Sequence, residues 1–361
     1  MVAATAPVDE FRCSQCGAPM AFAPGTSQLA CDHCGNAVAI TLAEGVIVSY
    51  DLFGPQAKAA LAAAAVVHEG REIECKQCGA RAMVTGQATR CAFCDAPMVV
   101  EVDAKAPGIP PGGVQPFAID GKAAADRFAT WLRKRWFAPG DLVARSRRDK
   151  LDGIYLPYWI FDSTSTTDYD GQRGTTRWET ETSRDASGNE QTRQVSHTDW
   201  FPVSGTVHVT KNDVLAIASP TLPAKLVAKL EPWELDKLRM FDHRFLAGFV
   251  AERYRVEPAD GFQTAYPVIE GAIKGAIRRD IGGDSQQIDN MNVNWDSVRF
   301  RHVLMPVWLS AFHYNDKVFH VAVNAATGEV VGERPYSASK IALFVLAIAA
   351  IIAVIVVLAT R

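Results

Sequence analysis

The stretch CSQCGAPMAFAPGTSQLACDHCGNAV at residues 13–38 recurs as CKQCGARAMVTGQATRCAFCDAPMVV at residues 75–100. Each copy contains two Cys-x-x-Cys pairs, separated by fourteen residues in the first copy and by twelve in the second. Two such pairs at this separation can place four thiolates around one tetrahedral ion. The repeat therefore predicts two zinc ribbons, each with one structural Zn2+. The predicted metal ligands are Cys13, Cys16, Cys31, Cys34, Cys75, Cys78, Cys91 and Cys94.

Glycine follows the second cysteine in three of the pairs, where the turn needs a positive φ or a close backbone approach. These residues are Gly17, Gly35 and Gly79, whereas Asp95 takes the place in the fourth pair. The alternative to zinc is a disulfide framework, which requires an oxidising compartment. Residues 1–12 have neither the charged start nor the apolar core of a secretory signal, so we expect reduced cysteines.

Changes in amino-acid composition divide the chain into segments. Residues 55–68 (PQAKAALAAAAVVH) are rich in alanine and predict a helix between the two ribbons. Residues 103–116 (DAKAPGIPPGGVQP) are rich in proline and glycine and predict a flexible linker, from which the ribbons would project. The expected organisation is zinc ribbon 1 at 11–40, a helical spacer at 41–72, zinc ribbon 2 at 73–102, the linker at 103–116, an α+β body at 117–335 and a transmembrane helix at 341–360.

The body mixes helical and strand patterns. Asp120 can cap a helix that runs to about Phe137. Polar and aromatic residues alternate over 163–182 and 194–210, which predicts a long β-hairpin with a polar turn at 184–191. We also expect a buried strand at 154–161, helices at 221–229, 232–240 and 258–280, and strands at 298–314, 318–324 and 329–333. The predicted fold class is α+β, with two N-terminal zinc ribbons, this body and one C-terminal transmembrane helix.

Residues 341–359 contain no charged or polar side chain. At about 1.5 Å per residue, a helix of this length would match the hydrocarbon thickness of a bilayer. Only two residues follow the run, which predicts a tail-anchored protein with a single membrane pass. Reduced, zinc-bound thiolates place the bulk of the chain in the cytoplasm, and Arg334 and Lys340 before the helix agree with the positive-inside rule. The expected location is therefore the cytoplasmic (inner) membrane.

The sequence offers little for catalysis. Its Gly121-Lys122 pair is followed by Ala123, so a phosphate-binding loop of the Gly-Lys-Ser/Thr type is absent and an ATPase motor is excluded. Four thiolates also close the zinc shell and leave no position for water. We therefore expect a protein that is not an enzyme. His33 as a replacement ligand, and a third metal site built from His302, His313 and His320, are weaker alternatives.

The charge pattern argues against nucleic acid. Residues 1–105 carry seven Lys/Arg and eleven Asp/Glu, and each four-thiolate zinc centre adds a charge of −2. One cluster of basic residues has three possible interpretations. It is a solvated surface, a contact for anionic lipid or a contact for nucleic acid. Ala349 and Ala353 form a small-xxx-small pair that is compatible with homo-oligomers. The basic cluster consists of Arg133, Lys134, Arg135, Arg145, Arg147, Arg148 and Lys150.

The chain resembles a bacterial family of tandem zinc-ribbon, C-terminally membrane-anchored proteins associated with phage-shock and envelope-stress systems. The resemblance rests on the tandem Cys-x-x-Cys ribbons, the segment LPYWIFD at 156–162, WFPVSG at 200–205, the closing MPVW and TGEVVGE segments and the terminal apolar helix. Such proteins are often named after the primosomal helicase, which has similar zinc knuckles. The resemblance implies a scaffold at the inner face of the membrane, with the eight cysteines and the terminal helix as its functional parts.

Three functions remain open at this point. The first is a non-enzymatic, tail-anchored adaptor that presents cytoplasmic zinc ribbons to a protein partner, in the envelope-stress response by resemblance. The second is a membrane-tethered, zinc-ribbon protein that binds nucleic acid. The third is an enzyme hidden in the body, for which the sequence offers dispersed acids such as Asp162, Asp168 and Asp170.

Overall fold

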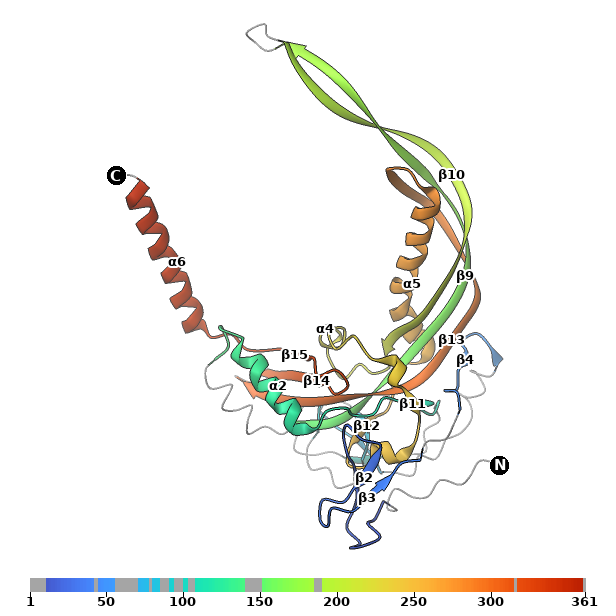
Figure 1. The fold of residues 1–361 in the computed structure, drawn as a ribbon, viewed down its shortest axis with the longest axis vertical. Coiled ribbons are helices and arrows are strands. Elements are labelled where there is room, and N and C mark those ends of the chain that lie inside the picture. The colour runs from blue at the N-terminus through green and yellow to red at the C-terminus, as the bar shows by residue number, and fades with distance from the viewer. Residues whose placement is uncertain are drawn as a thin grey trace.

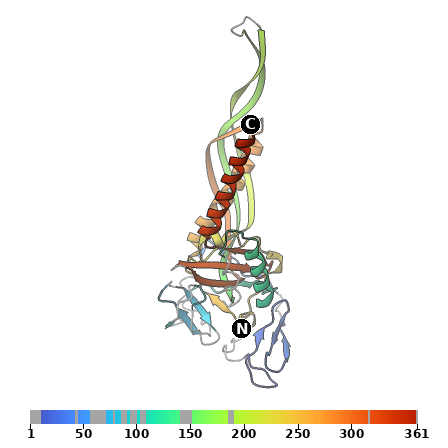
Figure 2. The ribbon, with the colours of Figure 1, turned by 90° about the vertical axis from the view of Figure 1, so that its left-hand side faces the viewer.

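The computed structural model describes residues 11–41, 45–55, 71–77, 80–84, 91–93, 100–102, 108–139, 151–184, 190–314 and 317–359. The protein has a mixed α/β fold with one large sheet and an apolar C-terminal helix. A broad base carries a long curved arm on one side, and the helix α6 (Ala338–Ala359) leaves the base toward the same side as the arm (Figure 1). The N-terminal units lie at the opposite end of the base (Figure 2).

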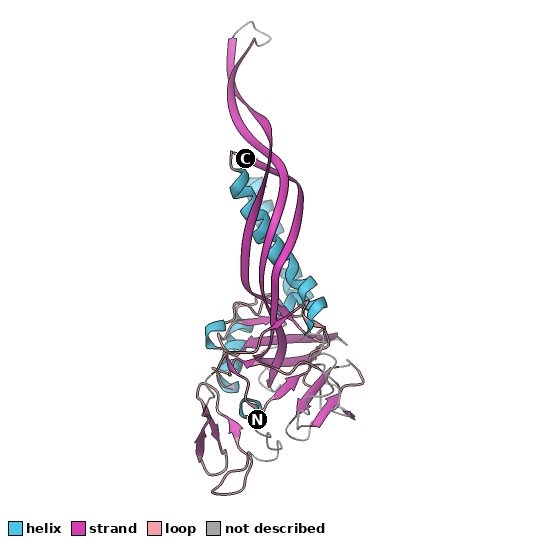
Figure 3. Ribbon diagram, turned by 90° about the vertical axis from the view of Figure 1, so that its right-hand side faces the viewer, coloured by secondary structure: helices cyan, strands magenta, loops and turns pink. Residues whose placement is uncertain are grey.

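The arm is built from three strands of unusual length. Strand β9 (Asp152–Arg184) pairs antiparallel with β10 (Glu190–Ile217) on one edge and with β13 (Ser285–Tyr314) on the other. Beyond the start of β13 the arm continues as β9 and β10 alone (Figure 3). The predicted long β-hairpin is confirmed, and the predicted buried strand at 154–161 is the root of β9.

In the base, the shorter strands pair around the ends of β9 and β13 that lie farthest from the tip of the arm. Its sheet runs in the order β11-β8-β13-β9-β12-β6-β5-β7, with β14, β15 and β4 on the β13 side. The predicted closing hairpin is confirmed as β14 and β15. The bounds are β4 Tyr50–Asp51, β5 Arg71–Glu74, β6 Arg81–Val84, β7 Val100–Val102, β8 Gly113–Val114, β11 Arg239–Met240, β12 Val250–Glu252, β14 Lys317–Asn324 and β15 Val330–Gly332.

Helix α5 (Pro258–Ile281) packs along one face of the arm. Its buried stripe repeats every four residues, at Ile269, Ile273, Ile277 and Ile281. The facing positions of β9 are small or hydroxylated, namely Ser163, Ser165 and Thr167, so the helix lies close to the strand. Further along, the Tyr169 hydroxyl donates a hydrogen bond of 2.6 Å to Asp280 at the end of the helix. The predicted helix at 258–280 is confirmed.

Strand β13 begins at Ser285, whereas the sequence predicted a strand only from residue 298. The reason is two β-bulges, one between Ile288 and Asn290 and one between Trp295 and Ser297. Each bulge adds a residue and exchanges the two faces of the strand. The apolar side chains that pack toward α5 therefore lie at an even-numbered position before the first bulge, at odd-numbered positions between the bulges and at even-numbered positions after the second bulge. This change hides the alternation with a period of two residues by which a strand is identified in a sequence. These side chains are Ile288, Met291, Val293, Trp295, Val298 and Phe300.

The helical predictions had mixed outcomes. Helix α2 (Gly121–Arg133) is capped as expected by Asp120, whose carboxylate accepts the Ala123 N–H at 2.7 Å, but it ends before Phe137. The predicted helix at 221–229 is a single turn, α4 (Ala224–Val227), and the one at 232–240 is wrong. In its place are the 3-10 turns η2 (Leu235–Lys237) and, further on, η3 (His243–Leu246), because Arg239 and Met240 pair with β8. The predicted spacer helix lies almost entirely outside the described residues.

The N-terminal units are docked on the base, which corrects the expectation that a linker decouples them. Phe22 packs edge-on against Phe245 at 5.2 Å, and its N–H donates to the Ala247 carbonyl at 2.9 Å. In the second copy, β6 pairs with β12 of the base. The described part of the linker also belongs to the sheet, since the Gly112 N–H donates to the His302 carbonyl. The cysteine units and the base therefore share one folded structure.

We expect Ile273→Ala to lower the free energy of unfolding by about 2–5 kcal/mol, because it leaves a cavity between α5 and the arm. The matched control is Val268→Ala on the same helix, where the side chain is 55 % exposed. This control should change stability by less than about 0.5 kcal/mol. Urea unfolding of the full chain in detergent, followed by circular dichroism, measures both. Equal changes in the two variants would contradict the role assigned to α5.

Candidate metal centre

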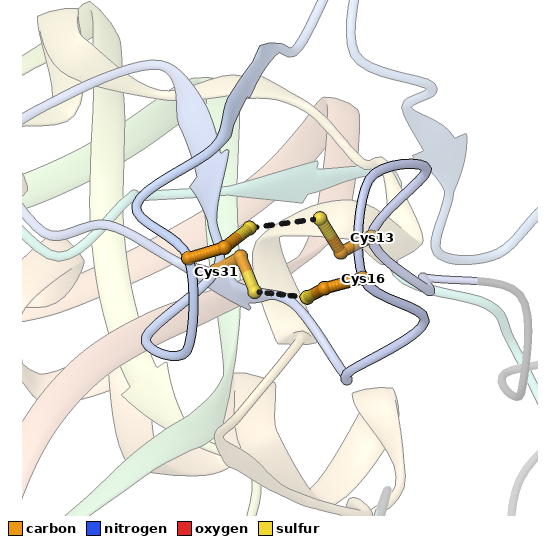
Figure 4. A group of neighbouring side chains, drawn as sticks. Cys13, Cys16 and Cys31 are labelled. Carbon is orange, nitrogen blue, oxygen red and sulfur yellow. Dashed lines mark hydrogen bonds between the residues drawn. The ribbon is translucent and has the colours of Figure 1, made fainter.

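Four sulfur atoms converge in the first N-terminal unit. Cys13, Cys16, Cys31 and Cys34 place their Sγ atoms within 4.8 Å of one another. The Cys13–Cys34 separation is 3.4 Å and the Cys16–Cys31 separation is 3.5 Å (Figure 4). A tetrahedral Zn2+ with Zn–S bonds of about 2.3 Å requires sulfur–sulfur edges of about 3.8 Å. The four thiols therefore fit one tetrahedral ion, and this half of the predicted ligand set lies together.

Two identical backbone turns position these thiols. In each turn the glycine N–H donates to the carbonyl of the first cysteine, from Gly17 to Cys13 at 2.8 Å and from Gly35 to Cys31 at 2.9 Å. Both glycines have a positive φ, of 74° and 75°, which side chains disfavour. The requirement read from the sequence for glycine at these two positions is thus met by the backbone geometry.

Short strands connect the turns and bind the unit to the base. Strands β1 (Ala21–Phe22), β2 (Gln28–Ala30) and β3 (Ala37–Ala39) form a separate three-stranded sheet. Cys13 and Cys31 are buried in the same apolar cluster as Phe22 and Leu29, whereas Cys16 and Cys34 are exposed. One side of the metal centre therefore faces the core of the base, and the other faces solvent.

Hydrogen bonds around the thiols were not anticipated from the sequence. The backbone N–H of Gln15 donates to Cys13 Sγ at 3.4 Å, and the Asn36 side-chain amide donates to the same sulfur at 3.5 Å. Such donors stabilise a thiolate and orient a metal ligand. The signal available in the sequence was the placement of polar residues directly beside the Cys-x-x-Cys pairs.

The thiols cannot all ionise without a cation. The Gln15 N–H holds the pKa of Cys13 at about 6, although desolvation opposes this shift. The backbone N–H of Asn36 favours the thiolate of Cys34. The neighbouring thiols of Cys13 and Cys16, together with desolvation, outweigh this effect and raise the pKa of Cys34 to about 12. A divalent cation would supply the charge that removes this repulsion, which is the chemistry expected of a four-cysteine site.

The second copy is described only in part. The Cys75 N–H donates to the Ala80 carbonyl at 2.9 Å, the same bond that Cys13 makes to Ala18 and Cys31 to Asn36. Cys75 and Cys91 are both buried in the core of the base. Cys78, Cys94, Gly79 and Asp95 lie outside the described residues, so the second ligand set stays a prediction.

The histidines considered from the sequence lie elsewhere. His302 is buried and bonded to the Ile109 carbonyl at 2.9 Å, and His320 contacts the Phe93 carbonyl at 2.6 Å. Among the described residues, the group of potential metal ligands is the N-terminal cysteine cluster, without His33. The contact of His320 instead ties the second cysteine unit to β14.

Comparison with known proteins finds one relative and no family. The Bacillus subtilis (strain 168) protein YdjG, itself described as uncharacterized, is 27 % identical over 233 residues. The aligned region covers 64 % of this chain and 66 % of YdjG, just under two thirds of that relative's length. No family model and no solved structure matches the chain.

Cys31→Ser should remove one metal ion per chain, because three thiolates and a hydroxyl bind zinc far more weakly than four thiolates. Elemental analysis of the purified full chain measures the loss. Ser14→Ala, at an exposed position between Cys13 and Cys16, is the control and should keep the full metal content. Full retention of metal by Cys31→Ser would contradict the ligand set.

Zinc affinity should fall as the pH is lowered. Metal binding requires thiolates, and the raised pKa of Cys34 means that this group must lose a proton to bind. We expect the apparent dissociation constant to rise about tenfold per pH unit for each proton released. Competition with a chromophoric chelator between pH 6 and 8 measures the slope, and a pH-independent affinity would exclude thiolate ligation.

Proposed function

We propose that the chain is a non-enzymatic, zinc-binding adaptor, anchored in the inner membrane by α6, which presents cytoplasmic zinc ribbons to a protein partner. The observation that carries the proposal is the four-cysteine cluster on a face remote from α6. Two structural Zn2+ ions, one for each cysteine repeat, complete the proposed assembly. A role in the envelope-stress response rests on the family resemblance of the sequence.

The placement of the two functional parts supports an adaptor. The helix α6 is exposed along its apolar length, and it is long and apolar enough to cross a membrane. The cysteine units lie at the opposite end of the base (Figures 1 and 2). A bilayer around α6 would therefore leave these units directed away from it, where a second protein can reach them.

The chemistry of the cysteine site supports a structural metal. Four thiolates fill the tetrahedral shell, so a bound water or substrate has no place on the ion. The buried Cys13 and Cys31 connect the ion to the core of the base. The metal would then fix the shape of the exposed face, which carries Cys16, Cys34 and Asp32, without taking part in a reaction.

The test is an affinity capture from gently solubilised membranes, comparing the wild type with Cys16→Ser/Cys34→Ser. Both side chains are exposed, so their replacement removes the ion without opening the core of the base. We expect a protein partner that the variant loses and that the Ser14→Ala control retains. Circular dichroism of the variant checks that the base remains folded.

Two outcomes would contradict the proposal. A partner that the metal-free variant still binds would remove the role of the cysteine unit. Nuclease-sensitive nucleic acid in the eluate, lost in the same variant, would favour the alternative of a membrane-tethered nucleic-acid-binding protein. The acidic balance of residues 1–105 argues against that alternative.

A further inference from the structure

The end of α2 and the beginning of α6 meet in space, although about 200 residues separate them in the sequence. The Ser337 N–H donates to the Phe137 carbonyl at 2.8 Å, and Lys340 Nζ donates to the Ala138 carbonyl at 2.8 Å. One turn later, the Phe137 and Phe344 rings pack edge-on at 5.4 Å. The point at which α6 leaves the base is therefore defined by both segments.

These two segments bring cations and aromatic rings to the start of α6. Residues 133–138 and 333–340 contain five Lys/Arg side chains and one carboxylate, Glu333. Trp136 is 74 % exposed and Tyr336 is 63 % exposed, and the Arg334 guanidinium lies 5.2 Å from the Tyr336 ring centre. We call the following six residues the collar: Arg133, Lys134, Arg135, Trp136, Tyr336 and Lys340.

Packing and helix capping account for only part of the collar. Arg133 donates to Thr130 and lies in the last turn of α2, where a cation is favoured by the helix dipole. Lys134 is the C-cap residue of α2, and the Arg135 guanidinium lies 4.8 Å from the Trp131 ring centre. Trp136 is exposed. A large exposed indole beside three consecutive cations is unfavourable in water, but it is the composition that accumulates where an apolar helix enters a bilayer.

We propose that the collar binds the anionic lipid headgroups of the bilayer that α6 crosses, with Trp136 and Tyr336 at the level of the headgroups. The inference rests on the membrane-spanning role of α6 in the proposed function. It assigns a second membrane contact to the end of α2, and that contact would fix the orientation of the base. The other basic residues named from the sequence, Arg145, Arg147, Arg148 and Lys150, lie outside the described residues.

The polarity of the arm restricts this orientation. In the free part of the β9–β10 hairpin, Arg177 forms ion pairs with Glu179 and Asp199, so this part cannot enter hydrocarbon. The arm rises on the same side of the base as α6 (Figure 1). A bilayer crossed by α6 must therefore be oriented so that the arm stays outside it. The collar would then be the part of the base left at headgroup level.

The test uses the full chain in lipid nanodiscs whose lipids carry bromine near the glycerol, which quenches tryptophan at headgroup depth. The difference in quenching between the wild type and Trp136→Phe isolates the signal of Trp136. We expect this signal to be quenched when phosphatidylglycerol is present. In Arg133→Gln/Lys134→Gln/Arg135→Gln, or without phosphatidylglycerol, we expect the quenching to fall about twofold, because the electrostatic attraction is lost.

Two controls keep the result specific. Arg173→Gln/Arg278→Gln/Arg279→Gln removes the same charge from exposed positions on the arm and α5, and should leave the quenching of Trp136 unchanged. Phe344→Trp in the Trp136→Phe background reports the immersion of α6 itself. Quenching at position 344 without quenching of Trp136 would overturn the collar and leave the anchor intact. Absence of quenching at both positions would overturn both.

The outcome is independent of the adaptor function. A protein or nucleic acid that binds the wild type and is lost from the triple Arg133→Gln/Lys134→Gln/Arg135→Gln variant, with Trp136 unquenched throughout, would show that the collar serves another partner. Capture by the cysteine unit is read separately through Cys16→Ser/Cys34→Ser. Failure of the collar therefore leaves that result unaffected, and failure of the capture leaves the quenching result unaffected.

Discussion

The ladder between β9 and β13 is the interaction on which the other elements depend. It runs from the pair of Gly174 with Ser285 in the arm to the pair of Asp152 with Leu309 in the base. Its upper part supports α5, and its lower part receives β8, β14 and β12 on its two edges. Because one pair of strands passes through both regions, the arm and the base form a single sheet. Helix α5, which covers the arm, therefore also stabilises the part of β9 and β13 to which the other strands of the base are attached.

The cysteine unit depends on the base for part of its apolar packing. A three-stranded sheet of such short strands buries little apolar surface of its own. The unit gains the missing contacts by placing Phe22 and Leu29 against the base, in the cluster that also contains Cys13 and Cys31. A metal ion held by the four cysteines would order the same turns that dock on the base. In the proposed function, such an ion would influence the shape of the face that a partner meets.

The apolar helix and the cysteine unit lie on opposite sides of the base. Helix α6 is held to the base by Lys340 and Phe344, beside the end of α2. The arm and α6 extend to one side, and the cysteine units lie on the other (Figure 2). The base therefore lies between the apolar helix and the four-cysteine cluster. Such a separation suits a protein that connects a membrane to a second macromolecule, which is the role proposed above.

The sequence by itself determined the features that rest on local chemistry. The Cys-x-x-Cys spacing predicted the cluster around Cys13, Asp120 predicted the start of α2, and the uninterrupted apolar run predicted α6, because each signal depends on residues adjacent in the chain. The tertiary structure alone decided where these parts meet. The bulge after Ile288 exchanged the faces of β13, and pairing of Arg239 with β8 replaced a predicted helix with a strand. The docking of Phe22 on Phe245 and of Ser337 on Phe137 joins residues more than 190 positions apart. No local pattern encodes such contacts, because their free energy comes from surfaces that exist only after the sheet has formed.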